Sequence, residues 1–160
     1  MLRMTTRAGR RAVPLLLIVA LLVGCGAPLA PTAPLLRIER VIDGDTLVIS
    51  TIGTVRLIGV DTPETVHPTQ PVQRFGREAS EFLRDLALGE AVRVDYDQTR
   101  TDRYGRTLAY VYLESGVFVN LEIIRQGYGF AYTAFPFRFI AEFRAAEREA
   151  REQGRGLWGG

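Results

Sequence analysis

The strongest constraint on the fold is a set of three short runs of β-branched and other apolar residues that closely follow one another. Residues 35–42, 46–51 and 54–60 form these runs, and the pairs Asp43-Gly44 and Ile52-Gly53 separate them. Such pairs favour tight turns because glycine adopts positive φ angles without a steric cost. The sequence therefore predicts three antiparallel strands joined as a meander.

The rest of the chain adds helices and further strands to this meander. Apolar residues at helical spacing predict a helix over residues 75–88, and Gly89 is suited to end it. The later patterns predict strands over residues 91–96 and 107–113, a short helix from an Asn120 N-cap to Gly127, and a last helix over residues 137–153. Five strands with a helix after the third indicate a mainly β chain with α, an OB-type five-stranded Greek-key barrel with three helices.

Residues 1–24 have the pattern of a bacterial signal peptide. An arginine-bearing polar stretch precedes an apolar run over residues 13–23, which is long enough for a signal-peptide core and short for a membrane span. The end of this run, Leu22-Val23-Gly24-Cys25, resembles the lipobox of bacterial lipoproteins, in which the cysteine is lipidated. Cys25 is the only cysteine, and lipidation accounts for it. We expect an exported protein anchored to a membrane on its extracytoplasmic side, with plain secretion as the alternative.

A proline-rich segment separates this leader from the rest of the chain. Residues 25–34 contain Pro28, Pro31 and Pro34, which disfavour a helix and keep the segment extended. We interpret it as a tether and expect the folded domain to span residues 35–160. Beyond the leader, 16 arginines face 18 acidic residues, and lysine is absent. Because its net charge is −2, the domain is no diffuse polycation, and any contact with a polyanion must be local.

Acidic residues flank the second and third predicted strands. Asp43 and Asp45 lie in the first turn, and Asp61 and Glu64 follow the third run. Taken separately, each group is also typical of a hairpin turn or a helix cap. On a meander, however, carboxylates at neighbouring strand ends can meet at one rim of a barrel, and oxygen ligands of this kind suit Ca²⁺. A zinc site is not expected, since His67 is the only histidine.

The third strand must bend if Arg56 and Asp61 serve one site. Strict alternation places these two side chains on opposite faces of a straight strand. Gly59 lies between them, and a glycine permits a bulge. We therefore expect the strand to change direction near Gly59.

A charged segment over residues 101–106 connects the last two predicted strands and is by itself typical of a solvated hairpin loop. This segment contains the motif Asp-Arg-Tyr-Gly-Arg. Three other motifs occur in the chain: Asp-Gly-Asp at residues 43–45, Asp-Thr-Pro-Glu at residues 61–64 and Arg-Gln-Gly at residues 125–127. In this order and spacing, the blocks resemble the staphylococcal nuclease (thermonuclease) family. The resemblance extends over residues 35–158 and implies an OB-fold phosphodiesterase that depends on Ca²⁺ and acts on DNA and RNA.

The resemblance also implies roles for individual residues. It implies that Asp45, Asp61 and the carbonyl of Thr62 are the Ca²⁺ ligands. It implies that Glu64 orients or deprotonates the attacking water. The residues implied to bind the substrate are Arg56 and Arg106 at the scissile phosphate, Arg103 and Tyr104 at a neighbouring phosphate, and Tyr132 against a base.

The chemistry of phosphodiester hydrolysis agrees with these roles. A phosphodiester anion repels a nucleophile, so the site must neutralise charge, and a metal ion with two guanidinium groups can do this. Two alternatives stay open: a catalytically silent OB-fold module that binds nucleic acid, and a surface lipoprotein whose carboxylates bind a stabilising Ca²⁺. No protein partner is implied, and we expect a monomer whose partners are DNA or RNA and, through Cys25, a membrane.

Overall fold

The computed structural model describes residues 35–65 and 73–159 of the chain. Within these ranges, no helix combines the length and the apolar character that a membrane span requires. The predicted signal peptide, the tether and Cys25 lie outside the described residues, as does His67.

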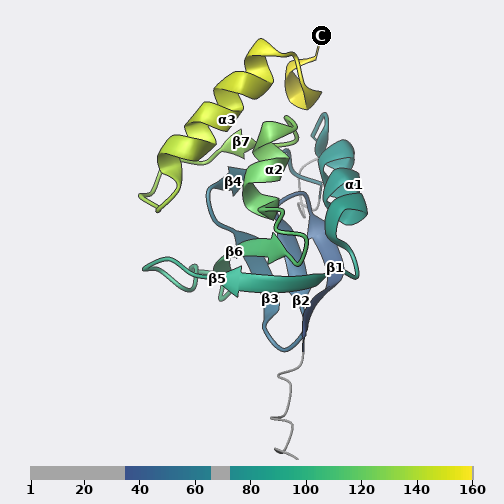
Figure 1. Cartoon of the computed structure of the whole chain (residues 1–160), viewed down its shortest axis with the longest axis vertical. Helices are drawn as coiled ribbons and strands as arrows, with labels where there is room; N and C mark the ends of the chain where they lie inside the picture. The colour runs from purple at the N-terminus through teal and green to yellow at the C-terminus, as the bar shows by residue number, and fades with distance from the viewer. Residues whose placement is uncertain (1–34, 66–72, 160) are drawn as a thin grey trace, which may run out of the picture. The chain divides into compact units, whose positions relative to one another are not determined.

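A closed five-stranded barrel confirms the predicted OB-type architecture (Figure 1). The strand order is β1-β2-β3-β6-β5, and β1 also pairs with β5. Strands β3 and β6 run parallel, whereas the other neighbours in the barrel run antiparallel. The barrel strands are β1 (Leu36–Asp43), β2 (Thr46–Ile49), β3 (Gly53–Leu57), β5 (Ala91–Asp95) and β6 (Thr107–Leu113).

The described residues form three α-helices, as predicted: α1 (Gly76–Ala87), α2 (Val119–Arg125) and α3 (Ile140–Glu152). Helix α1 packs against β1, and α2 packs against both β6 and α3. Figure 1 shows α2 between the barrel and α3. A short 3₁₀ helix, η1 (Gly156–Trp158), follows α3.

The third predicted strand is divided by a turn. It is β3 as far as Leu57, and a separate short strand, β4 (Val60–Asp61), follows. The turn contains Gly59 at φ 76°, a left-handed conformation that favours glycine. A Cβ atom at Gly59 would lie 2.7 Å from the Phe137 ring, so there is also no space for a side chain. The expected change of direction near Gly59 is thus confirmed.

Strand β7 (Phe130–Ala131) is absent from the sequence-based expectations, and it pairs antiparallel with β4. Two residues are too few for an alternation pattern, so the sequence offers no signal for this strand. Its pairing with β4 connects the segment before α3 to the strand that carries Asp61.

The predicted N-cap role of Asn120 is wrong. Helix α2 begins one residue earlier, at Val119, and Asn120 is fully buried within it. The Asn120 side chain accepts a hydrogen bond from the Val111 N–H and donates to the carbonyls of Ile58 and Ala109. These bonds satisfy backbone groups of β6 and of the turn after β3, so Asn120 holds the helix on the barrel.

The hydrophobic core fills the barrel and extends under the helices. Helix α3 begins at Ile140, three residues later than predicted, and buries Phe143, Ala146 and Ala150. The largest fully buried side chains are Tyr110, Phe143, Ile38, Leu47, Ile49, Leu57, Leu83, Ile123 and Ile124. This core supports the barrel rim at which the acidic turns lie.

Candidate active site

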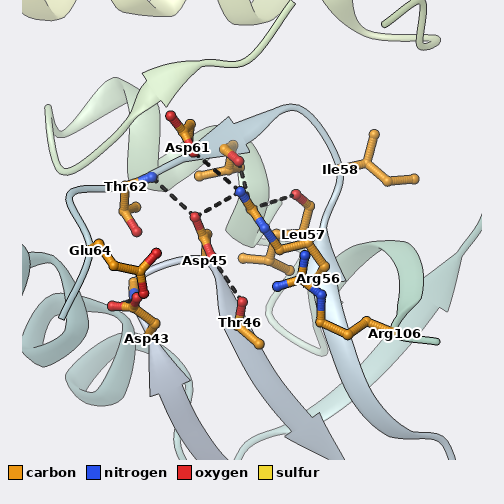
Figure 2. A network of polar contacts seen from close by, with 12 residues as sticks. Asp43, Asp45, Thr46, Arg56, Leu57, Ile58, Asp61, Thr62, Glu64 and Arg106 are labelled. Atoms are coloured by element: carbon orange, nitrogen blue, oxygen red, sulfur yellow. Dashed lines mark hydrogen bonds and ion pairs between the residues drawn. The ribbon is translucent and has the colours of Figure 1, made fainter. Parts of the chain in front are cut away.

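Arg56 lies between two of the predicted carboxylates. Its Nη2 atom is 2.9 Å from Asp45 Oδ2 and 3.3 Å from Asp61 Oδ1 (Figure 2). Asp45 lies in the turn between β1 and β2, Arg56 lies on β3, and Asp61 ends β4. The strands are paired so that Arg56 is opposite Thr46, the residue after Asp45. The barrel thus brings together three side chains from separate elements.

The guanidinium of Arg56 is also held by the backbone. Its Nη1 donates to the Val60 carbonyl at 2.6 Å and to the Leu57 carbonyl at 3.4 Å. These carbonyls lie on either side of the turn at Gly59, which explains how Arg56 and Asp61 reach the same site. Because both nitrogens have partners, the Arg56 side chain has a defined orientation.

Asp45 is a buried carboxylate with several hydrogen bonds. Its Oδ2 accepts from the Thr62 N–H at 3.1 Å, and its Oδ1 accepts from the Thr46 hydroxyl at 2.9 Å. Burial raises the pKa of Asp45, because desolvation of the charged form outweighs the opposing charge of Arg56 and the hydrogen bonds. A cation bound beside Asp45 would reduce this cost of burial.

The donor atoms around Asp45 and Asp61 fit a hard cation. Two carboxylates converge on one nitrogen, and the neighbouring Thr62 Oγ1 is buried without a hydrogen-bond partner. In residues 35–65 and 73–159, no group of three or more His, Cys, Asp or Glu side chains could by itself hold a metal ion. An ion here would therefore need backbone oxygens, hydroxyl groups or water as further ligands, which Ca²⁺ accepts readily.

Glu64 lies in the segment that follows β4, on the side of the site where Figure 2 also places Asp43. Its backbone N–H donates to Gln73 Oε1 at 3.1 Å, and its carbonyl accepts from the Gln73 N–H at 2.9 Å. Asp43 itself is buried and accepts hydrogen bonds from Thr65 and Ser80. The sequence predicts no individual role for Asp43, although its place in the Asp-Gly-Asp turn puts it close to the predicted ligand Asp45.

Arg106 is held by Asp102, an acidic residue for which the sequence predicts no individual role. Its Nε donates to Asp102 Oδ2 at 2.7 Å, and Asp102 Oδ1 accepts from the N–H groups of Tyr104 and Arg106. Burial alone would raise the pKa of Asp102, but these hydrogen bonds lower it overall. Figure 2 shows the Arg106 side chain extending toward Arg56 from the segment before β6.

Arg103 and Tyr104 lie at the tip of the same loop. The Tyr104 side chain is 68% exposed, and the guanidinium carbon of Arg103 is 4.7 Å from its ring centre. Arg106 approaches the same ring at 5.4 Å. An exposed ring with two guanidinium groups around it can contact both a phosphate and a base.

The family model described as "Staphylococcal nuclease homologue" matches residues 54–160. The thermonuclease of Staphylococcus hyicus is 40% identical over 126 residues, which cover 76% of this chain and 74% of that protein. The chain belongs to the staphylococcal nuclease family. The thermonuclease of Staphylococcus intermedius is 42% identical over 127 residues, with the same coverage. Endonuclease YncB of Bacillus subtilis is 37% identical over 127 residues, which cover 76% of this chain and 60% of that protein.

In this member of the family, Tyr132 lies beside the turn at Gly59. Its backbone N–H donates to the Gly59 carbonyl at 2.9 Å, directly after the pairing of β7 with β4. The side chain is 41% exposed, and its ring centre is 6.1 Å from that of the exposed Phe135. The structure therefore places an accessible aromatic residue beside the turn that leads into β4, the strand that carries Asp61. Its role against a base stays a prediction.

The nuclease fold brings the predicted residues together to different degrees. Asp45, Arg56, Asp61 and Thr62 are connected by direct contacts. Arg103, Tyr104 and Arg106 form a second group on the loop between β5 and β6. The roles assigned to these residues, to Glu64 and to Tyr132 stay predictions.

Proposed function

We propose that this nuclease is a Ca²⁺-dependent phosphodiesterase that hydrolyses DNA, RNA or both by in-line attack of water on the phosphodiester. Nuclease activity and a nucleic acid substrate follow from membership of the family. The observation that carries the proposal is the convergence of Asp45 and Asp61 on the Arg56 guanidinium. This arrangement offers carboxylates to a cation and a guanidinium to a phosphate at one place.

Asp45, Asp61 and the carbonyl of Thr62 would hold the Ca²⁺ ion. When bound, Ca²⁺ polarises a phosphoryl oxygen and neutralises charge at the reacting phosphate. The bond from the Thr62 N–H to Asp45 Oδ2 supports this assignment, because it holds the backbone of Thr62 beside the buried carboxylate.

Arg56 and Arg106 bind the scissile phosphate. A guanidinium donates two parallel N–H groups to a phosphate and therefore stabilises the charge that develops on the equatorial oxygens. Asp102 orients Arg106 through its bond to Nε, which leaves the terminal nitrogens of Arg106 for the substrate. Because Asp102 positions Arg106 before the substrate arrives, this donor needs little reorganisation, whereas Arg56 must exchange its bonds to Asp45 and Asp61 for bonds to the phosphate.

Glu64 accepts a proton from the attacking water as a general base. Arg103 and Tyr104 hold a neighbouring phosphate, and Tyr132 packs against a base. These contacts outside the reacting phosphate orient the substrate strand for in-line attack.

The location of this nuclease is the extracytoplasmic side of a membrane. Lipidation of Cys25 anchors the chain, residues 25–34 act as the tether, and the domain acts as a monomer. If Cys25 is not lipidated, the nuclease is secreted instead.

Cleavage of single-stranded and double-stranded DNA and RNA by the purified protein tests the proposed reaction. We expect cleavage with Ca²⁺, little cleavage with Mg²⁺, and none after chelation, because Mg²⁺ demands stricter octahedral geometry. Equal turnover with Mg²⁺ would contradict the Ca²⁺ dependence. Binding of the same nucleic acids without cleavage would support the silent OB-fold module instead.

A further inference from the structure

Asp43 is a buried carboxylate that makes no ion pair with any described residue. It ends β1, two residues before Asp45, and its exposed fraction is 6%. Burying a carboxylate is costly unless hydrogen bonds or an opposite charge compensate for it. Hydrogen bonds must therefore compensate for the burial of the Asp43 carboxylate.

Four hydrogen bonds reach the Asp43 carboxylate from separate segments. Oδ1 accepts from the Thr65 hydroxyl at 2.6 Å, from the Ser80 hydroxyl at 3.0 Å and from the Gly44 N–H at 2.8 Å. Oδ2 accepts from the Thr65 N–H at 3.3 Å. The carboxylate thus connects the end of β1 with helix α1 and with the segment that follows β4.

Thr65 is the residue after Glu64, so Asp43 fixes the backbone directly beside the proposed general base. The backbone of Glu64 is also held by Gln73, whose side-chain Oε1 accepts from the Glu64 N–H and whose own N–H donates to the Glu64 carbonyl. Asp43 therefore connects the position of Glu64 to the turn that carries Asp45.

Helix α1 supports the same segment by close packing. A Cβ atom at Gly76 would lie 2.8 Å from Thr65 Cγ2 and 2.9 Å from the Pro63 carbonyl. Contact this close leaves no room for a side chain, so the backbone around Glu64 rests directly on the start of α1. Ser80, one turn further along α1, is buried and points its hydroxyl at Asp43.

We propose that Asp43 is a positioning residue that, through Thr65 and Ser80, holds Glu64 in place for its reaction with water. This inference rests on the proposed function of Glu64. A general base acts efficiently only within hydrogen-bond reach of the water, and an error of about 1 Å in such a position can cost about a hundredfold in rate. A buried carboxylate with four donors provides the required rigidity.

A matched pair of substitutions at Thr65 tests the proposal. Thr65→Val keeps the shape of the side chain but removes the hydroxyl, whereas Thr65→Ser keeps the hydroxyl. With a single-stranded DNA oligonucleotide and Ca²⁺, we expect kcat of Thr65→Val to fall about tenfold or more while KM changes by less than about twofold. Thr65→Ser should restore most of kcat. An equal fall in kcat in Thr65→Val and Thr65→Ser would overturn the proposal.

The same substitution in a Glu64→Gln background separates positioning from a merely structural role. If Thr65 acts through Glu64, Thr65→Val should cause no further loss of kcat there. If the two losses multiply, Thr65 acts independently of Glu64 and the proposal is wrong. It is also wrong if Glu64→Gln leaves kcat unchanged.

Substitutions of serine and a measurement of amide exchange complete the test. Ser80→Ala should lower kcat in the same sense as Thr65→Val, whereas Ser115→Ala, in the exposed turn after β6, should not. If the protein cleaves no nucleic acid at all, the proposed function fails. Hydrogen exchange at the residue 65 amide then tests whether the Thr65 hydroxyl and Asp43 hold this backbone in place. Exchange should be faster in Thr65→Val than in Thr65→Ser, and equal exchange in the two variants would overturn the proposal.

Discussion

Arg56 Nη2 lies 2.9 Å from Asp45 Oδ2, and the two side chains are only 16% and 9% exposed. A pair this buried has lost most of its hydration, so each charge depends on the other. The same nitrogen also reaches Asp61, at 3.3 Å. Arg56 therefore supplies positive charge to a rim that two carboxylates would otherwise make strongly repulsive.

Removal of Arg56 should destabilise the fold. In Arg56→Met, measured with a chelator present, we expect the free energy of unfolding to fall by about 3 kcal/mol, because Asp45 is left buried without its partner. Urea denaturation measures the loss. The double variant Asp45→Asn with Arg56→Met leaves only the exposed Asp61 without its partner and no unpaired buried charge, so it should lose less stability than Arg56→Met alone. A larger loss in the double variant would contradict this explanation.

Arg56→Lys should not preserve the activity. Lysine keeps the charge but lacks the planar group that donates two parallel hydrogen bonds. We expect turnover to fall on the order of tens of times, as for loss of one preorganised donor. Steady-state cleavage of DNA with Ca²⁺ measures the change, and a thermal melt checks that the variant folds. A rate near that of the wild type would refute two-point binding by Arg56.

Gly59→Ala should destabilise the protein more than the same change at another glycine with positive φ. Gly59 has φ 76°, and its Cβ would clash with Phe137 and Phe143. Conformational strain of about 1–2 kcal/mol and overpacking of about 1–3 kcal/mol act together. Gly53 is the matched control, since it has φ 88° and open space around it. Equal losses in the two variants by urea denaturation would show that packing at Gly59 contributes little.

Asp97 should contribute stability that acid removes. The hydrogen bond from the Tyr110 hydroxyl, with further bonds from the N–H groups of Arg138 and Gln98, lowers the pKa of Asp97 below its ordinary 3.8. Because the folded pKa is the lower one, the contribution is present above about pH 3.8 and is lost as the pH falls through the folded pKa.

Asp97→Asn should therefore be less stable than the wild type near neutral pH, and the difference should narrow in acid below the ordinary carboxyl pKa. Urea denaturation near neutral pH and in acid below pH 3.8 measures the difference in the free energy of unfolding between Asp97→Asn and the wild type. Asp85→Asn, which removes an exposed carboxylate on α1, is the control for the loss of one negative charge. A difference that stays constant with pH would show that the charge of Asp97 is not responsible.

Cys25→Ser should release the protein from the membrane fraction and leave nuclease activity intact. The reason is the lipobox-like tetrad followed by a proline-rich segment, which we expect to act as a tether between an anchor and the domain. Fractionation of cells that express each form, with a nuclease assay on each fraction, measures it. If the wild type is already fully soluble after export, the lipobox interpretation is wrong. If the serine variant is exported but inactive, Cys25 belongs to the folded domain.

The strands, helices and charged motifs of the domain could be predicted from the sequence because their signals are local. The strand predicted over residues 107–113 matches β6 at both ends, and apolar spacing places α1 to within one residue. A single site that contains both Arg56 and Asp61 requires the strand to bend between them, and this requirement predicts the turn at Gly59. In these cases the pattern depends on residues close together in the chain.

The partners of the buried polar side chains could not be predicted in this way. Asp43 bonds to Ser80, which is 37 residues away, and Asn120 bonds to Ile58 at a separation of 62 residues. No local pattern specifies such distances, because the donors meet only when the barrel closes and helices α1 and α2 pack on it. Local sequence patterns thus predict the fold class and the chemical types in the site, whereas the packed fold selects which groups satisfy one another, since burial makes every unpaired polar atom costly.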